Sequence, residues 1–118
     1  MWKAACALLL FTAGVGQLNA TVNVRQYKLD MAADNGFTKS YVYGVGEGLL
    51  MANIEASKKG SALFCQPPKL ALTIENYADI IDRVIRELSN APASEIDPIP
   101  IPIILLRGLR ETFPCSAK

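Results

Sequence analysis

The sequence contains no histidine. Because histidine is the commonest general base in enzymes and the commonest metal-binding side chain, its absence excludes Ser-His-Asp and Cys-His catalytic arrangements and every histidine-based metal site. Catalysis by paired carboxylates stays open in principle, but no pair stands out among the eleven acidic residues. We therefore expect a protein that is not an enzyme and that holds no cofactor and no metal ion.

The sequence also lacks a block of like charge and, after its first twenty residues, a long apolar run. Twelve lysines and arginines face eleven aspartates and glutamates, which gives a net charge of +1. Nucleic-acid-binding domains carry clustered basic residues, and a membrane helix needs roughly twenty consecutive apolar residues. We expect no nucleic-acid partner, and no membrane association of the chain that follows residue 20.

The first twenty residues have the composition of a cleavable signal peptide. Lys3 gives a positively charged start, residues 4–15 are uncharged and mostly apolar, and Ala20 is the small residue that a signal peptidase needs. A membrane anchor or a buried N-terminal helix is the alternative, but the apolar stretch is shorter than the roughly twenty residues of an anchor. We expect cleavage after Ala20 and export to the periplasm.

Three cysteines are present, and one of them, Cys6, lies in the predicted signal peptide. Cys65 and Cys115 stay in the mature chain. Because exported proteins fold in an oxidising compartment, these two favour one intramolecular disulfide over two free thiols or a bridge between chains. The closed loop of about fifty residues would stabilise the fold by on the order of 4 kcal/mol.

The mature chain has the length of one domain with one modest core. Residues 21–36 are polar and weakly patterned, so we expect an extended or irregular segment there. Residues 37–118 contain three segments with helical periodicity. The predicted fold class is all-α, a small bundle of about three to four helices with one intramolecular disulfide.

The longest predicted helix covers residues 37–57, with Asp34 or Asn35 as its N-cap. Its predicted apolar face consists of Phe37, Tyr41, Val45, Leu49 and Met51 or Ala52. Gly44 and Gly48 lie four residues apart on one side of this helix, and we expect another helix to pack closely there. The alternative, a phosphate-binding loop at these glycines, would need a preceding strand and a different glycine spacing.

Two further helices follow. Thr73 caps a helix over residues 74–90, which separates apolar from charged side chains more clearly than any other segment. Its apolar face consists of Ile74, Tyr77, Ile80, Ile81, Val84, Ile85 and Leu88. Residues 92–102 include four prolines, so we expect irregular structure there. The last helix begins near Pro102 and ends by Phe113. Its core-facing residues are Ile103, Leu105, Leu106, Leu109 and Phe113.

Two short motifs carry a resemblance to a known family. A Phe-Cys-Gln-Pro-Pro motif at 64–68 precedes the second predicted helix, and a Phe-Pro-Cys motif at 113–115 follows the third. Together with the signal peptide and a helix that opens with Tyr-Val-Tyr-Gly-Val at 41–45, they resemble the Rap/Tai-type immunity proteins of type VI secretion systems. The resemblance covers roughly residues 37–115. The chain departs from the family pattern at 38–40, where members often have a further cysteine, and in its proline-rich segment before the last helix.

The resemblance implies a periplasmic immunity-type protein that binds a cognate peptidoglycan amidase effector and inhibits it by steric occlusion. We place the partner contact in the loop 90–97, with Glu95 and Asp97, because loops at helix junctions project furthest; an ordinary solvated loop is the alternative interpretation. The alternative function is a structural or chaperone-like periplasmic helical protein with no toxin partner. A homodimer through the glycine-bearing face of the first helix is a further hypothesis.

Overall fold

The computed structural model describes residues 21–116, so the predicted signal peptide and its cleavage site lie outside the described residues. The described chain contains five helices and no strand: α1 (Val24–Ala32), α2 (Gly36–Lys58), α3 (Ile74–Glu87), α4 (Ala93–Ile96) and α5 (Ile101–Thr112). The predicted all-α fold is confirmed. None of these helices is long and apolar enough to cross a membrane.

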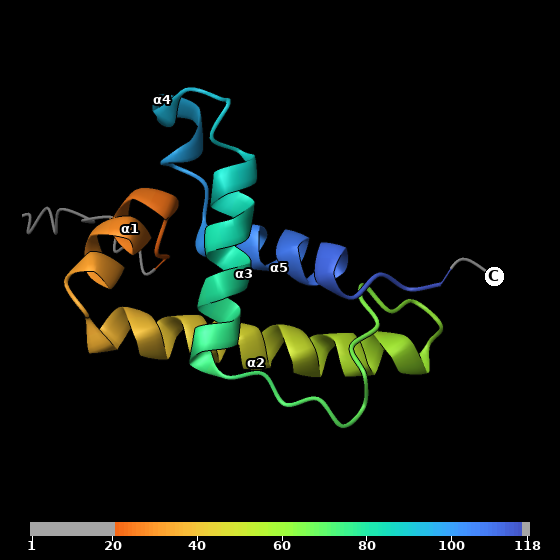
Figure 1. Ribbon diagram of the computed structural model, residues 1–118. Helices are drawn as coiled ribbons and strands as arrows, with labels where there is room; N and C mark the ends of the chain where they lie inside the picture. The colour runs from red at the N-terminus through yellow and green to blue at the C-terminus, as the bar shows by residue number, and fades with distance from the viewer. Residues whose placement is uncertain (1–20, 117–118) are drawn as a thin grey trace, which may run out of the picture.

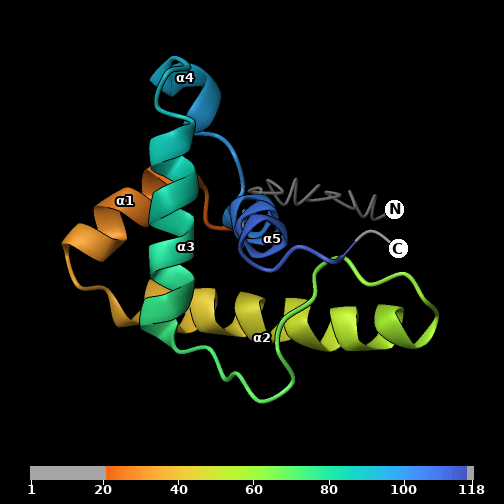
Figure 2. The same cartoon turned by 45° about the vertical axis from the view of Figure 1, so that its right-hand side comes forward.

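The long helix α2 forms the base of the molecule, and α3 stands across it (Figures 1 and 2). Helix α5 packs against α3 and also contacts α2, while α1 joins the first half of α2. The short helix α4 lies at the end of α3 that is remote from α2, and both views show it at an extremity of the fold.

The ends of α2 follow from local chemistry. The Asn35 side-chain oxygen accepts hydrogen bonds from the backbone N–H groups of Phe37 (2.9 Å) and Thr38 (3.3 Å), which confirms Asn35 as the N-cap. The helix ends at Lys58, and Gly60 adopts a positive φ of 74° just after it. The predicted boundaries are therefore correct to one residue at each end.

The predicted packing glycines are wrong. The glycine that another helix approaches is Gly46, where a Cβ atom would lie 2.5 Å from ring carbons of Tyr77 in α3. At Gly44 and Gly48 a Cβ atom would meet no atom of the described chain within 4 Å. The three glycines alternate along α2, so only the position of the Tyr77 ring distinguishes the middle one.

The predicted apolar face of α2 is correct only in part. Tyr41, Val45 and Leu49 pack against the core, but Phe37 is 73% exposed and Met51 is also exposed. The buried positions of α2 are Thr38, Val42, Gly46 and Asn53. The prediction missed this stripe because three of its four members are not large apolar residues.

Helix α3 matches its prediction closely. Thr73 and Asn76 form a reciprocal capping box, in which each side chain accepts from the other residue's backbone N–H. The helix ends at Glu87 rather than at Asn90, because the chain turns there and the Ser89 N–H donates to the Arg86 carbonyl. Its buried residues are Tyr77, Ala78, Ile80, Ile81 and Val84.

The segment before the last helix is more regular than predicted. Residues 92–102 contain α4, whose Ile96 side chain is buried in the core. Helix α5 begins at Ile101, as predicted to within one residue, but Ile103 is 59% exposed instead of core-facing. The α5 residues in the core are Ile101, Ile104, Leu105 and Leu109.

The prediction of an extended or irregular segment over residues 21–36 is wrong, because α1 fills most of it. Asn23 caps this helix by accepting from the Gln26 N–H at 2.8 Å. Only Val24 and Tyr27 of α1 are buried. Two buried residues in nine are too few to give a readable helical period, and this explains the error.

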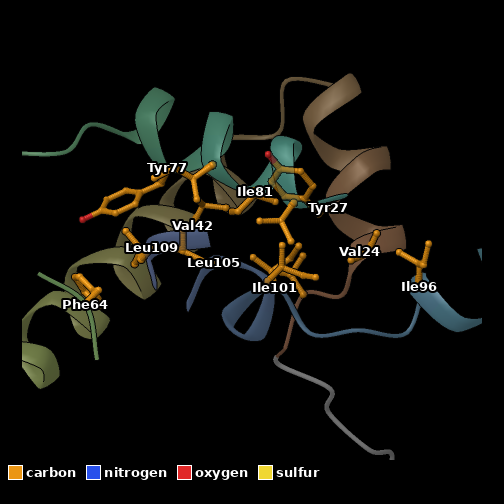
Figure 3. Packing of buried hydrophobic residues seen from close by; sticks show 14 residues of the cluster. Val24, Tyr27, Val42, Phe64, Tyr77, Ile81, Ile96, Ile101, Leu105 and Leu109 are labelled. Carbon is orange, nitrogen blue, oxygen red and sulfur yellow. The ribbon is translucent and has the colours of Figure 1, made fainter. Parts of the chain in front are cut away.

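One core cluster joins all five helices, and Figure 3 shows how its side chains converge. Two tyrosines are buried in this cluster, and the hydroxyl group of each is hydrogen-bonded to a carboxylate. The Tyr27 hydroxyl donates to a carboxylate oxygen of Asp82 at 3.0 Å, and the Tyr77 hydroxyl donates to Glu47 at 3.0 Å. These bonds fasten α1 to α3 and α3 to α2.

The buried tyrosines predict alkaline unfolding. Burial and the neighbouring carboxylates raise the pKa of Tyr27 and of Tyr77 above the ordinary value of 10.0. Since the folded-state pKa is raised, the stability that these groups contribute is fully present below about pH 10 and is lost as the pH rises above it. We expect the urea midpoint to fall above pH 10, and to fall less steeply in a Tyr27→Phe/Tyr77→Phe variant. An identical pH profile for the two proteins would contradict this origin.

A charge network fastens α3 to α5 on the surface. The Arg83 guanidinium donates to Glu87 (2.8 Å), Glu111 (3.1 Å) and Thr112 (2.9 Å), and Arg107 donates to Glu111 at 2.8 Å. The hydrogen bond from Arg107 lowers the pKa of Glu111. Exposed pairs of this kind contribute only about 0–1 kcal/mol each, so the network orients the two helices more than it stabilises them.

Candidate functional site

The two motifs of the family resemblance meet in space. Cys65 and Cys115 form the predicted disulfide, with their sulfur atoms 2.02 Å apart and their Cα atoms 4.9 Å apart. Beside it, the Cys65 N–H donates to the Phe113 carbonyl at 2.7 Å. The loop that follows α2 is thereby fixed to the end of α5.

A buried asparagine fixes the same loop to α2. The Asn53 amide donates to the Phe64 carbonyl at 2.8 Å, and its oxygen accepts from the N–H groups of Leu63 (2.7 Å) and Phe64 (3.2 Å). Sequence reasoning missed this residue. The available signal was a short amide residue inside a helix, where it is disfavoured unless its side chain has a partner.

The loop and the second half of α2 enclose a groove of about 430 Å³. Figure 2 shows this loop returning along the end of α2 before it leads into α3. The volume falls within the range of roughly 300–1,000 Å³ that is typical of ligand sites. The lining residues, which define the α2–loop groove, are Leu50, Asn53, Ile54, Ser57, Ala62, Phe64, Cys65, Gln66, Pro67, Pro68 and Leu70.

The polar side chains of the α2–loop groove already have partners within the chain. The Ser57 hydroxyl donates to the Ile54 carbonyl at 2.7 Å, and the Gln66 amide donates to the Leu70 carbonyl at 2.5 Å. The Asn53 amide is occupied as described above. The groove therefore offers a ligand mainly apolar contact.

The predicted contact residues Glu95 and Asp97 lie at a second surface, the α4 corner (residues 93–97). Asp97 is engaged there: its carbonyl accepts from the Arg25 N–H at 3.2 Å, and its carboxylate lies 3.9 Å from the Lys28 ammonium. Glu95 is exposed, and the ion pairs within residues 21–116 do not include it. Of the two residues, Glu95 is the one that is available to a partner.

The segment that follows the α4 corner is hydrogen-bonded to the chain just before α1 and to the first residue of that helix. Val24 donates its N–H to the Ile99 carbonyl at 2.9 Å, and Ile101 donates to the Val22 carbonyl at 2.9 Å. These bonds flank an isolated antiparallel bridge between Asn23 and Pro100. Pro100 has no N–H to donate, and the bridge uses the N–H and C=O groups of its two neighbours instead.

Neither surface holds a candidate metal centre among the described residues. Over residues 21–116 no group of three Cys, Asp or Glu side chains is placed to hold a metal ion. The chain matches no protein-family model, no curated protein and no solved structure. The α4 corner and the α2–loop groove are the two surfaces that bear on its function.

Proposed function

We propose that this protein is an exported immunity-type protein that inhibits a peptidoglycan amidase by steric occlusion. The observation that carries the proposal is the α4 corner, a narrow projection at the end of the fold that presents Glu95 to solvent. An inhibitor of this kind needs a shape that fits a cleft, and it needs no catalytic group of its own. The motif resemblance supplies the class of partner.

The rigidity of the projection supports this function. A projection that is already ordered loses little conformational entropy when it enters a cleft, and binding is stronger for that reason. Burial of Ile96 and the backbone bonds to residues 22–25 supply such order here. Asp97 contributes from inside the corner, where it fixes the projection to α1.

The disulfide supports the proposed compartment. A bond between Cys65 and Cys115 persists in an oxidising compartment such as the periplasm and is rare in the cytosol. Peptidoglycan lies in the same compartment. Export by the predicted signal peptide would therefore bring the inhibitor to the place where an amidase acts.

The experiment is an inhibition assay with the amidase that the neighbouring reading frame encodes. We expect the purified full chain to block cleavage of peptidoglycan, and Glu95→Arg to weaken inhibition by about 30-fold, the effect of losing one central contact. Glu75→Arg is the matched control, because Glu75 is an exposed glutamate in the first turn of α3, the end remote from α4. Absence of inhibition, or equal effects of the two variants, would contradict the proposal.

The apolar α2–loop groove favours the second candidate function, a chaperone-like protein without a toxin partner. Such a protein would suppress aggregation of unfolded clients and would bind a dye that reports exposed apolar surface. We expect neither activity to depend on Glu95. Client holding together with no effect on any amidase would establish the second function in place of the first.

A further inference from the structure

We propose that the α2–loop groove is a docking site for a partner-protein segment that carries large apolar side chains flanked by carboxylates. The inference rests on the proposed function only in taking the chain to be a binding protein. It concerns a different surface from the α4 corner, at the other end of the molecule.

The groove is formed before any partner arrives. Asn53 donates one hydrogen bond to the loop and accepts two, which hold residues 63–64 against α2. At the next residue, the disulfide and the hydrogen bond from Cys65 to Phe113 hold the loop to the end of α5. Pro67 and Pro68 restrict the backbone just after these anchors, and the hydrogen bond from the Gln66 amide to the Leu70 carbonyl closes the turn that contains them. A wall that is anchored at residues 63–65 and stiff beyond them resists collapse onto α2.

Large apolar side chains gather at the groove and stay partly in water. Ile54 is 40% exposed and Leu70 is 42% exposed, and both line the groove; Leu63, beside it, is exposed as well. Contact with a partner would remove this apolar surface from water, which favours binding. A helix on one side and a loop on the other make the shape that accepts the apolar face of a peptide segment.

The hydrogen bonding of the lining argues against a polar ligand. The amide groups of Asn53 and Gln66 and the hydroxyl of Ser57 donate to backbone carbonyls of the chain itself. A sugar or a peptidoglycan fragment would bury polar groups here without gaining partners, which is costly. The groove therefore suits aliphatic or aromatic side chains.

Lysines next to the lining residues of the groove favour a segment with acidic residues on either side of its apolar side chains. Lys58 and Lys59 follow the lining residue Ser57, and Lys69 precedes the lining residue Leu70. The nearby Glu55 pairs with Lys58 at 2.7 Å. Lys59 and Lys69 belong to no ion pair of the described residues. Two uncompensated ammonium groups complement carboxylates and repel a basic segment.

The first test measures peptide binding by the full chain at low salt. The probes are a labelled peptide of repeated Glu-Glu-Leu-Leu and its Lys-Lys-Leu-Leu counterpart. We expect the acidic peptide to bind at least about 10-fold more tightly. Ile54→Asp or Leu70→Asp should weaken binding of the acidic peptide about 10-fold or more. Ile103→Asp, a change of a still more exposed apolar residue on α5, should leave it unchanged.

The second test reverses the charge of Lys59 and Lys69, the two lysines next to lining residues of the groove. Lys59→Glu/Lys69→Glu should lose the preference for the acidic peptide, whereas Arg86→Glu/Arg110→Glu, which changes the net charge equally elsewhere, should keep it. Failure of the acidic peptide to bind, equal binding of both peptides, or equal effects of the two double variants would overturn the inference. Sedimentation with phosphatidylglycerol vesicles that Ile54→Asp abolishes would show a lipid site and would overturn it too.

The two proposals fail separately in these assays. If amidase inhibition holds and peptide binding is absent, the groove inference falls and the proposed function stands. If the peptide binds as expected and the chain inhibits no amidase, the proposed function falls. Glu95→Arg should bind the acidic peptide like the unmodified chain, because Glu95 is not among the residues that line the groove.

Discussion

Replacing both Cys65 and Cys115 by serine is expected to lower the free energy of unfolding by about 4 kcal/mol. The two residues are separated by 50 positions, and opening a loop of that length restores a large conformational entropy to the unfolded chain. A domain of this size has a total stability of about 5–15 kcal/mol, so the loss is a large fraction of it. Urea unfolding with and without a reductant measures the change.

The reductant supplies the control for this prediction. It should destabilise the unmodified chain by about the same amount as the double serine variant and should leave that variant unaffected. The backbone bond from Cys65 to Phe113 and the hydrogen bonds of Asn53 do not need the disulfide. The reduced chain should therefore keep its helical circular dichroism in the absence of urea. An unmodified chain that is indifferent to reductant would show that the bond contributes little.

Gly46→Ala is expected to destabilise the protein by about 3 kcal/mol, while Gly48→Ala stabilises it by about 0.5–1 kcal/mol. The added methyl group at position 46 would lie 2.5 Å from the Tyr77 ring, whereas at position 48 it meets open space. The ring cannot easily retreat. Its hydroxyl is bonded to Glu47, and the ring forms a T-shaped pair with Tyr43, with the ring centroids 6.3 Å apart.

The opposite signs make this pair of variants informative. Both replace glycine by the same residue in the interior of the same helix, so helix propensity favours alanine in both. The difference between their urea midpoints isolates the contact with the α3 ring. In a Tyr77→Leu background the cost of Gly46→Ala should shrink, because the two residues are in contact and their effects are coupled. Equal effects of the two glycine substitutions would contradict the packing at Gly46.

The elements that the sequence predicts well carry their signals locally. Helix α3 has a threonine cap, one apolar side and one charged side, and each of these is visible within the segment itself. The same holds for the ends of α2 at Asn35 and Gly60. The disulfide follows from the cysteine count and the predicted compartment. None of these inferences needs knowledge of what the segment packs against.

The errors arise where the decisive partner is distant in sequence. Gly46 differs from Gly44 and Gly48 only through its contact with the Tyr77 ring, which lies thirty-one positions away in the sequence. The Tyr27 side chain of α1 likewise finds its partners in α3, where its hydroxyl bonds to Ala78 and Asp82. In α5, Ile103 and Ile104 are chemically identical, and the crossing with α3 decides which is buried. Such information is absent from a local pattern.

The α2–loop groove also combines a part that the sequence marks locally with a part that depends on distant contacts. Its loop wall contains the Phe-Cys-Gln-Pro-Pro motif, which the sequence marks clearly. Its other wall is an unremarkable stretch of α2 around Leu50 and Ile54, and the residue that joins the two walls is Asn53. The sequence does not distinguish Glu95 from Asp97, whereas in the structure only Asp97 contacts Arg25 and Lys28.

The pairing of residues 22–25 with 97–101 determines when folding can finish. The chain crosses the membrane N-terminus first if it is exported as proposed, so α1 would emerge long before the backbone groups of Asp97, Ile99 and Ile101 that it needs. Contacts of such large sequence separation form late and slowly. Cys115, the second half of the disulfide, lies closer still to the C-terminus. The domain would therefore complete its fold after translocation has ended, and the half-exported chain would have to be kept from aggregating until then.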